Sequence, residues 1–149
     1  MGRVVVGVDG SDASRRALEW SVAEARLREA EVVAVHAWSL PIIPGPMGTY
    51  VPPPPSDQIQ TEAERVLDDE LTRLGDAAGG VRVTRQVVEM PPARALIRAA
   101  QGADMLVVGS RGLGGFRGLL LGSVGHQCAQ HATCPVVIVP HDERGSADS

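Results

Sequence analysis

Five short runs rich in apolar, β-branched residues recur along this 149-residue chain and alternate with stretches whose apolar residues have helical spacing. Short runs of this kind are typical of strands in a parallel sheet, which is buried on both faces. The alternation predicts an α/β domain with a doubly wound, five-stranded parallel sheet and helices on both faces. The third run alternates apolar and polar residues, which favours an edge strand. The strands are expected at residues 3–8, 31–37, 81–88, 105–108 and 136–139.

Composition narrows the class of protein. The length suits one domain, which we expect at residues 1–140 with a polar tail at 141–149. A net charge of −4 argues against a nucleic-acid partner. No apolar run approaches the roughly 20 residues that cross a membrane, and we expect no signal peptide, because the first residues are expected to form a strand. Two isolated cysteines, Cys128 and Cys134, complete the expectation of a cytoplasmic protein without a membrane partner.

The segment after residues 105–108 combines a strand end, many glycines and a helix start. Gly109 ends the strand, Arg111 and Arg117 lie in the glycine-rich part, and Ser123 is expected to cap the last helix. Free backbone N–H groups and the positive end of the helix dipole then point the same way, which favours binding of an anion such as phosphate. The alternative is a surface loop without a ligand.

Three glycines and a serine of this segment have a specific spacing. Gly109, Gly112, Gly122 and Ser123 read as G-x2-G-x9-G-S, which resembles the ATP-binding signature of the universal stress protein family. A Walker-type site does not fit, because the chain has no lysine, and the glycines are out of register with a Rossmann fingerprint. The resemblance covers essentially the whole chain. It implies a Rossmann-like, adenine nucleotide alpha hydrolase-like fold with strand order 3-2-1-4-5, and a homodimer through Val136–Val139.

The resemblance also implies where an adenine nucleotide would bind. Asp9 follows the first strand at the edge where α/β sheets bind ligands, and it would contact ribose or help hold a cation. The alternative is a turn aspartate that caps the next helix. Ala37 would offer its backbone to adenine, and His36 is expected to be a structural hydrogen-bond partner. The residues expected to contact the nucleotide are Gly7, Asp9, Ala37, Val108, Gly109, Gly112, Gly122, Ser123 and Val124.

The predicted function is ATP binding by a stress or signalling module, with ATP alone or with Mg²⁺ or Mn²⁺. Gly112, Gly122, Ser123 and Val124 would hold the phosphates, mainly through backbone N–H groups. We expect no catalytic residue, because no side chain stands out as a general base or nucleophile. Three alternatives stay open: a slow Mg²⁺- or Mn²⁺-dependent ATPase, a structural dimer that does not retain ATP, and a cyclic AMP binder.

The stretch at 38–55 is expected to be irregular. Seven prolines lie between Pro41 and Pro55, and proline lacks an N–H group and fixes φ. We therefore expect neither helix nor sheet here, but a long loop of the kind that often forms a lid or a contact surface. The next helix should begin at Ser56 or Thr61. Its acidic residues are expected mainly on the solvent side: Glu62, Asp68, Asp69 and Glu70.

Overall fold

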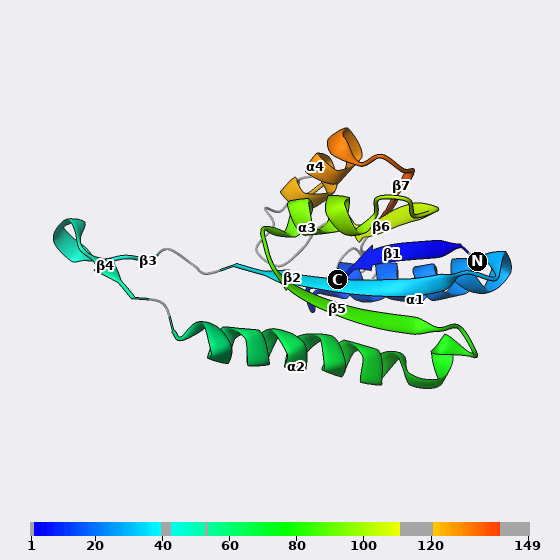
Figure 1. The fold of residues 1–149 in the computed structure, drawn as a ribbon, viewed down its shortest axis with the longest axis horizontal. Coiled ribbons are helices and arrows are strands. Elements are labelled where there is room, and N and C mark those ends of the chain that lie inside the picture. The colour runs from blue at the N-terminus through cyan, green and yellow to red at the C-terminus, as the bar shows by residue number, and fades with distance from the viewer. Residues whose placement is uncertain (1, 40–42, 53, 111–120, 141–149) are drawn as a thin grey trace, which may run out of the picture.

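The computed structural model describes residues 2–39, 43–52, 54–110 and 121–140. In these ranges five strands form one parallel sheet in the order β5-β2-β1-β6-β7, with helices on both sides (Figure 1). Numbered along the chain, this is the predicted order 3-2-1-4-5, and β5 is the predicted edge strand. The sheet comprises β1 (Arg3–Gly7), β2 (Glu31–Trp38), β5 (Val83–Glu89), β6 (Met105–Gly109) and β7 (Val136–Val139). The helices are α1 (Asp12–Arg28), α2 (Ser56–Leu74), α3 (Pro92–Ala99) and α4 (Ser123–His131), with 3₁₀ turns η1 (Pro46–Gly48) and η2 (Gly75–Ala78).

The helices divide the core into two layers. On one face, α1 and α2 pack against the sheet, and on the other face α3 and α4 do so (Figure 1). Residues 4–6 of β1 and 106–107 of β6 are fully buried between the layers. This burial on both faces explains why the sequence of these strands is continuously apolar. One face of α1 is also buried against the sheet, including Ala17, Leu18, Ser21, Val22 and Ala25.

The proline-rich stretch contains more regular structure than predicted. Ile43–Pro44 (β3) and Tyr50–Val51 (β4) pair as an antiparallel hairpin across η1. The prediction that no sheet forms here is therefore wrong. A pair this short needs few donors, and Gly45 supplies one, its N–H donating to the Thr49 carbonyl at 2.7 Å. Figure 1 shows this hairpin projecting away from the sheet beyond the end of β2.

Helix α2 begins at Ser56, the first of the two predicted starts. Glu62, Asp68 and Asp69 are exposed as expected, but Glu70 is 5% exposed and faces the core. The solvent position predicted for Glu70 is therefore wrong, because Ala63, Leu67, Glu70 and Leu74 follow one face of the helix. In the part of the chain that the structure describes, neither α2 nor any other helix is long and apolar enough to cross a membrane.

The two cysteines differ in access. Cys128 is completely buried in α4, and burial raises the pKa of its thiol to about 11. Cys134 is half-buried, and burial raises its pKa as well. At pH 8 a thiol of pKa 11 is ionised in about 0.1% of molecules, against about a quarter for an ordinary cysteine. We expect iodoacetamide to modify Cys134 before Cys128, as followed by peptide mass spectrometry. Equal native-state rates would contradict the buried position of Cys128.

Candidate functional site

The strand order of the sheet reverses at a switch point between β1 and β6. From β1 the chain passes to β2 and β5 on one side, and β6 and β7 lie on the other. In open α/β sheets, ligands bind beyond the carboxyl ends of the strands at such a switch point. Asp9 follows β1, Ala37 is the second-last residue of β2, and Gly109 is the last residue of β6. The structure thus brings these three predicted residues to one edge of the sheet.

Helix α4 begins beside the end of β6. The Gly122 N–H donates to the Ser110 carbonyl at 2.6 Å, and the Ser110 N–H donates to the Val139 carbonyl at 2.8 Å. Gly122 is the N-cap residue of α4, with φ −72° and ψ 170°, and Ser123 is the first helical residue. The predicted Ser123 cap is therefore wrong, because the chain enters the helix one residue earlier.

The start of α4 differs from that of α1 in how its N–H groups are satisfied. In α1, the Ser11 Oγ accepts a hydrogen bond from the Ser14 N–H at 3.2 Å. In α4, the described residues provide no side-chain cap. Uncapped N–H groups in the first turn are suited to an anionic ligand. These groups include the backbones of Ser123 and Val124, both predicted phosphate contacts.

Asp9 holds the turn before α1. Its Oδ1 accepts a hydrogen bond from the Ser11 N–H at 2.9 Å, and its own N–H donates to the Ser14 Oγ at 3.2 Å. Gly10 between them has φ 85°, a left-handed conformation that favours glycine. The turn position of Asp9 in the alternative interpretation is therefore confirmed, but the residue that caps α1 is Ser11 and not Asp9. Its contact with ribose stays a prediction.

Two predicted site glycines have a packing role in the structure. A Cβ at Gly109 would lie 2.8 Å from the backbone carbon and the Cβ of Ala13 in α1. A Cβ at Gly7 would lie 2.8 Å from the Leu96 side chain in α3. Each glycine therefore lets a helix pack closely against a strand end, on opposite faces of the sheet.

His36 joins the ends of β1 and β2. Its Nδ1 lies 2.7 Å from the Val8 carbonyl oxygen, so this nitrogen carries the proton and donates it to the carbonyl. The predicted structural role of His36 is confirmed. The bond fixes the chain next to Ala37, the residue predicted to face adenine.

Comparison with known proteins identifies the family. The family model described as the universal stress protein family matches residues 1–140. The chain belongs to the universal stress protein family. A universal stress protein of Mycobacterium tuberculosis strain H37Rv is 42% identical over 135 residues, which are 91% of this chain and 44% of the relative. The chain thus spans less than half the length of that curated relative.

Solved structures of universal stress proteins share the fold. One, in complex with cAMP, is 31% identical with a TM-score of 0.67, and the match covers 95% of this chain and 98% of that one. Another, from Archaeoglobus fulgidus in complex with dAMP, is 25% identical with a TM-score of 0.66, covering 93% and 98%. The predicted adenine nucleotide alpha hydrolase-like fold is confirmed.

Two residues that no sequence pattern marks also lie at the site edge of this universal stress protein domain. Ser110 is 5% exposed and holds Gly122 through its carbonyl. The Trp38 indole N–H donates to the Gln60 Oε1 at 2.6 Å and so connects β2 with α2. Neither contact is visible in the sequence, because each depends on how distant elements pack.

Part of the predicted site lies outside the described residues, namely Gly112 together with Arg111 and Arg117. Among the residues that are described, no group of three or more His, Cys, Asp or Glu side chains is placed to hold a metal ion.

Proposed function

We propose that the chain binds an adenine nucleotide, ATP foremost, at the edge between β1 and β6, and acts as a nucleotide-dependent stress or signalling module. The observation that carries this proposal is the start of α4, which Ser110 holds against the end of β6 without a side-chain cap from the described residues. Such a helix start at the switch point suits a phosphate. The two solved relatives that hold cAMP and dAMP support an adenine ligand.

Each part of the nucleotide would meet a different element of the fold. The N–H groups of Ser123 and Val124 would hold phosphate oxygens, whereas the Gly122 N–H is already donated to Ser110. Gly122 would contribute space for the phosphate, because it has no side chain. Ala37 lies two residues beyond Val35, the last partner of β1, so β2 extends past β1 toward the expected adenine. Asp9 would face the ribose.

Binding is tested by identifying the ligand that co-purifies and by calorimetry. The native protein is denatured, and the released small molecules are identified by mass spectrometry. The emptied protein is then titrated with ATP, AMP and cyclic AMP. Stoichiometric ATP with tighter binding of ATP than of AMP would support the proposal. Absence of binding to all three would contradict it and favour the structural dimer.

Experiments on the same purified protein distinguish two alternative functions, a cyclic AMP binder and a slow ATPase. Tighter binding of cyclic AMP than of ATP would favour the cyclic AMP binder, in line with the relative that was solved in complex with cAMP. Release of inorganic phosphate from ATP with Mg²⁺ or Mn²⁺, absent in a variant that cannot bind ATP, would establish the slow ATPase. The proposal assigns no catalytic residue.

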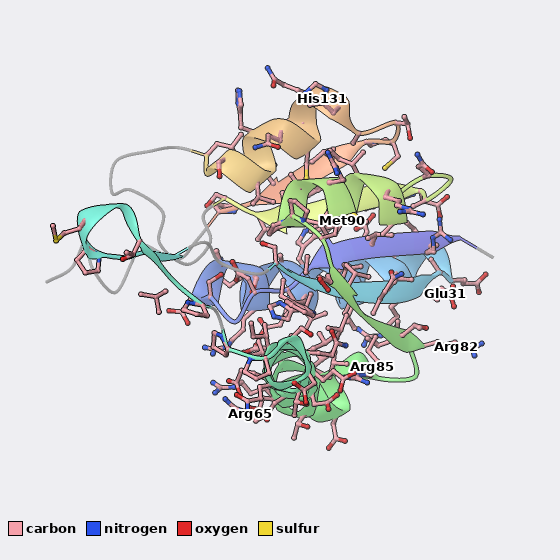
Figure 2. The ribbon with its side chains drawn as sticks, turned by 60° about the vertical axis from the view of Figure 1, so that its left-hand side comes forward. Glu31, Arg65, Arg82, Arg85, Met90 and His131 are labelled. Carbon is pink, nitrogen blue, oxygen red and sulfur yellow. The ribbon has the colours of Figure 1, made fainter. Side chains whose placement is uncertain are left out.

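We also propose a homodimer through the open edge of β7. This strand, Val136–Val139, is wholly apolar. The opposite edge strand β5 carries Arg85, which is labelled in Figure 2 and is paired to Asp68 of α2 at 2.9 Å. Charged side chains on an edge strand discourage pairing with another chain. The contrast therefore favours β7 as the edge that pairs.

The dimer is tested by removing one edge donor. The Pro135 and Val139 carbonyls accept from β6, so by alternation the Ile138 N–H points to the open edge. Ile138→Pro should convert the dimer to a monomer in sedimentation velocity. Val87→Pro removes an outward donor from β5 in the same way and should leave the dimer intact. A dimeric Ile138→Pro protein would contradict the proposed interface.

A further inference from the structure

Helix α2 carries a buried carboxylate, Glu70, on the side that faces α1 and the turn with Asp9. Glu70 is 5% exposed, on the same face of α2 as the buried residues Leu67 and Leu74. Burial of a charged group is destabilising unless the group is paired with good geometry. Its partner is Arg15 of α1, whose Nε donates to both Glu70 oxygens at 2.9 and 3.2 Å. The pair therefore fixes α2 to the first turn of α1.

Arg15 also reaches the turn before α1. Its Nη2 donates to the Gly10 carbonyl at 3.4 Å, and its Nη1 donates to Asp12 at 3.0 Å. A Cβ at Gly10 would lie 3.6 Å from Val66, so α2 itself packs behind this turn. The guanidinium thus binds α2, α1 and the turn at the same time. Its rigid fork of donors allows all three contacts from one side chain.

We propose that Arg15 and Glu70 are positioning residues for nucleotide binding, because they hold the Gly10 carbonyl and with it the turn that presents Asp9. This role rests on the proposed nucleotide site. Neither side chain is assigned a contact with the nucleotide. Their effect is transmitted through the Asp9–Ser11 hydrogen bond at 2.9 Å, which fixes the orientation of the Asp9 carboxylate.

The test separates positioning from stability. Glu70→Gln keeps the size of the side chain but removes its charge, and Arg15→Met/Glu70→Leu replaces the pair by apolar groups, an exchange that often preserves stability. Both variants should bind ATP about tenfold more weakly, which is the size of effect expected for residues coupled to a site they do not contact. The double variant should keep the thermal midpoint of the wild type. Calorimetry and thermal unfolding give the two readouts.

The matched control removes an ion pair from the outer face of the same helix. Arg65, labelled in Figure 2, pairs there with Glu62 and Asp69. All three side chains are more than half exposed. Glu62→Gln should therefore leave both ATP affinity and stability unchanged. If the double variant is stable and binds ATP like the wild type, the pair is merely structural and the inference is overturned.

Hydrogen exchange at the turn distinguishes failure of this inference from failure of the proposed function. Without any nucleotide, the Ser11 amide should exchange faster in Glu70→Gln than in Glu62→Gln, because the turn is less firmly held. Unchanged exchange would overturn the inference even if ATP binds the wild type. Faster exchange in a protein that binds no adenine nucleotide would refute the proposed function, and with it the positioning role.

Discussion

Replacement of Gly122 by glutamate should abolish ATP binding while the fold stays intact. Gly122 is the N-cap of α4 with an extended backbone, φ −72° and ψ 170°, which any residue adopts. The new carboxylate would stand where the phosphates are proposed to bind. Two like charges about 4 Å apart repel by about 4 kcal/mol near a protein surface, so binding should weaken by at least about 100-fold. Calorimetric titration with ATP measures the loss.

Two further substitutions at the same position separate charge from bulk. Gly122→Ala adds one methyl group and should keep most of the affinity. Gly122→Gln has nearly the size of glutamate without its charge, and its loss should be smaller than that of Gly122→Glu. Circular dichroism and sedimentation should match the wild type for all three. Unchanged ATP affinity in Gly122→Glu would show that the phosphates bind elsewhere.

Replacement of Gly109 by alanine should cost more stability than any other glycine-to-alanine change proposed for this chain. The added Cβ would lie 2.8 Å from the backbone carbon of Ala13 and 3.0 Å from its oxygen. Backbone atoms of a packed helix cannot move aside without displacing α1 from the sheet. Overpacking of this kind costs about 1–3 kcal/mol, and contact with backbone places Gly109→Ala near the upper end. Urea denaturation gives the free energy of unfolding.

Gly7→Ala is the matched comparison on the other face of the sheet. There the added Cβ would meet the end of the Leu96 side chain, which can shift more easily than the helix backbone that a Cβ at Gly109 would meet. The expected loss is about 1 kcal/mol, clearly less than at Gly109. Equal losses at both positions, or none at Gly109, would contradict the close contact of α1 with the end of β6.

The sequence predicts those features that depend on local pattern. The apolar runs of β1 and β6 are continuous because both strands are buried on two faces, so their existence and type are readable. The strand order has no local signal, and it follows here from the family resemblance of Gly109, Gly112, Gly122 and Ser123. The N-cap of α1 is a local feature of the same kind, because Ser11 directly precedes the first helical residue.

Two of the wrong predictions depend on exact position or on distant contacts. Ser123 has the chemistry of a cap, but the Ser110 carbonyl fixes Gly122 one residue earlier as the N-cap. Glu70 lies in the buried stripe of α2 by its helical spacing, yet its charge favours solvent until Arg15, 55 residues earlier, is seen beside it. The partner that permits burial is not visible in the local sequence.

The most direct test of the nucleotide site is an NMR titration of the ¹⁵N-labelled protein with ATP. Binding at the proposed edge predicts saturable shifts of the amides of Ala37, Ser123 and Val124, with Asp9 affected through the ribose. Amides of β5 near Thr84, at the far edge of the sheet, should stay unchanged. If millimolar ATP leaves the amides of Ser123 and Val124 unmoved, the helix start does not bind phosphate and the account of this site is wrong.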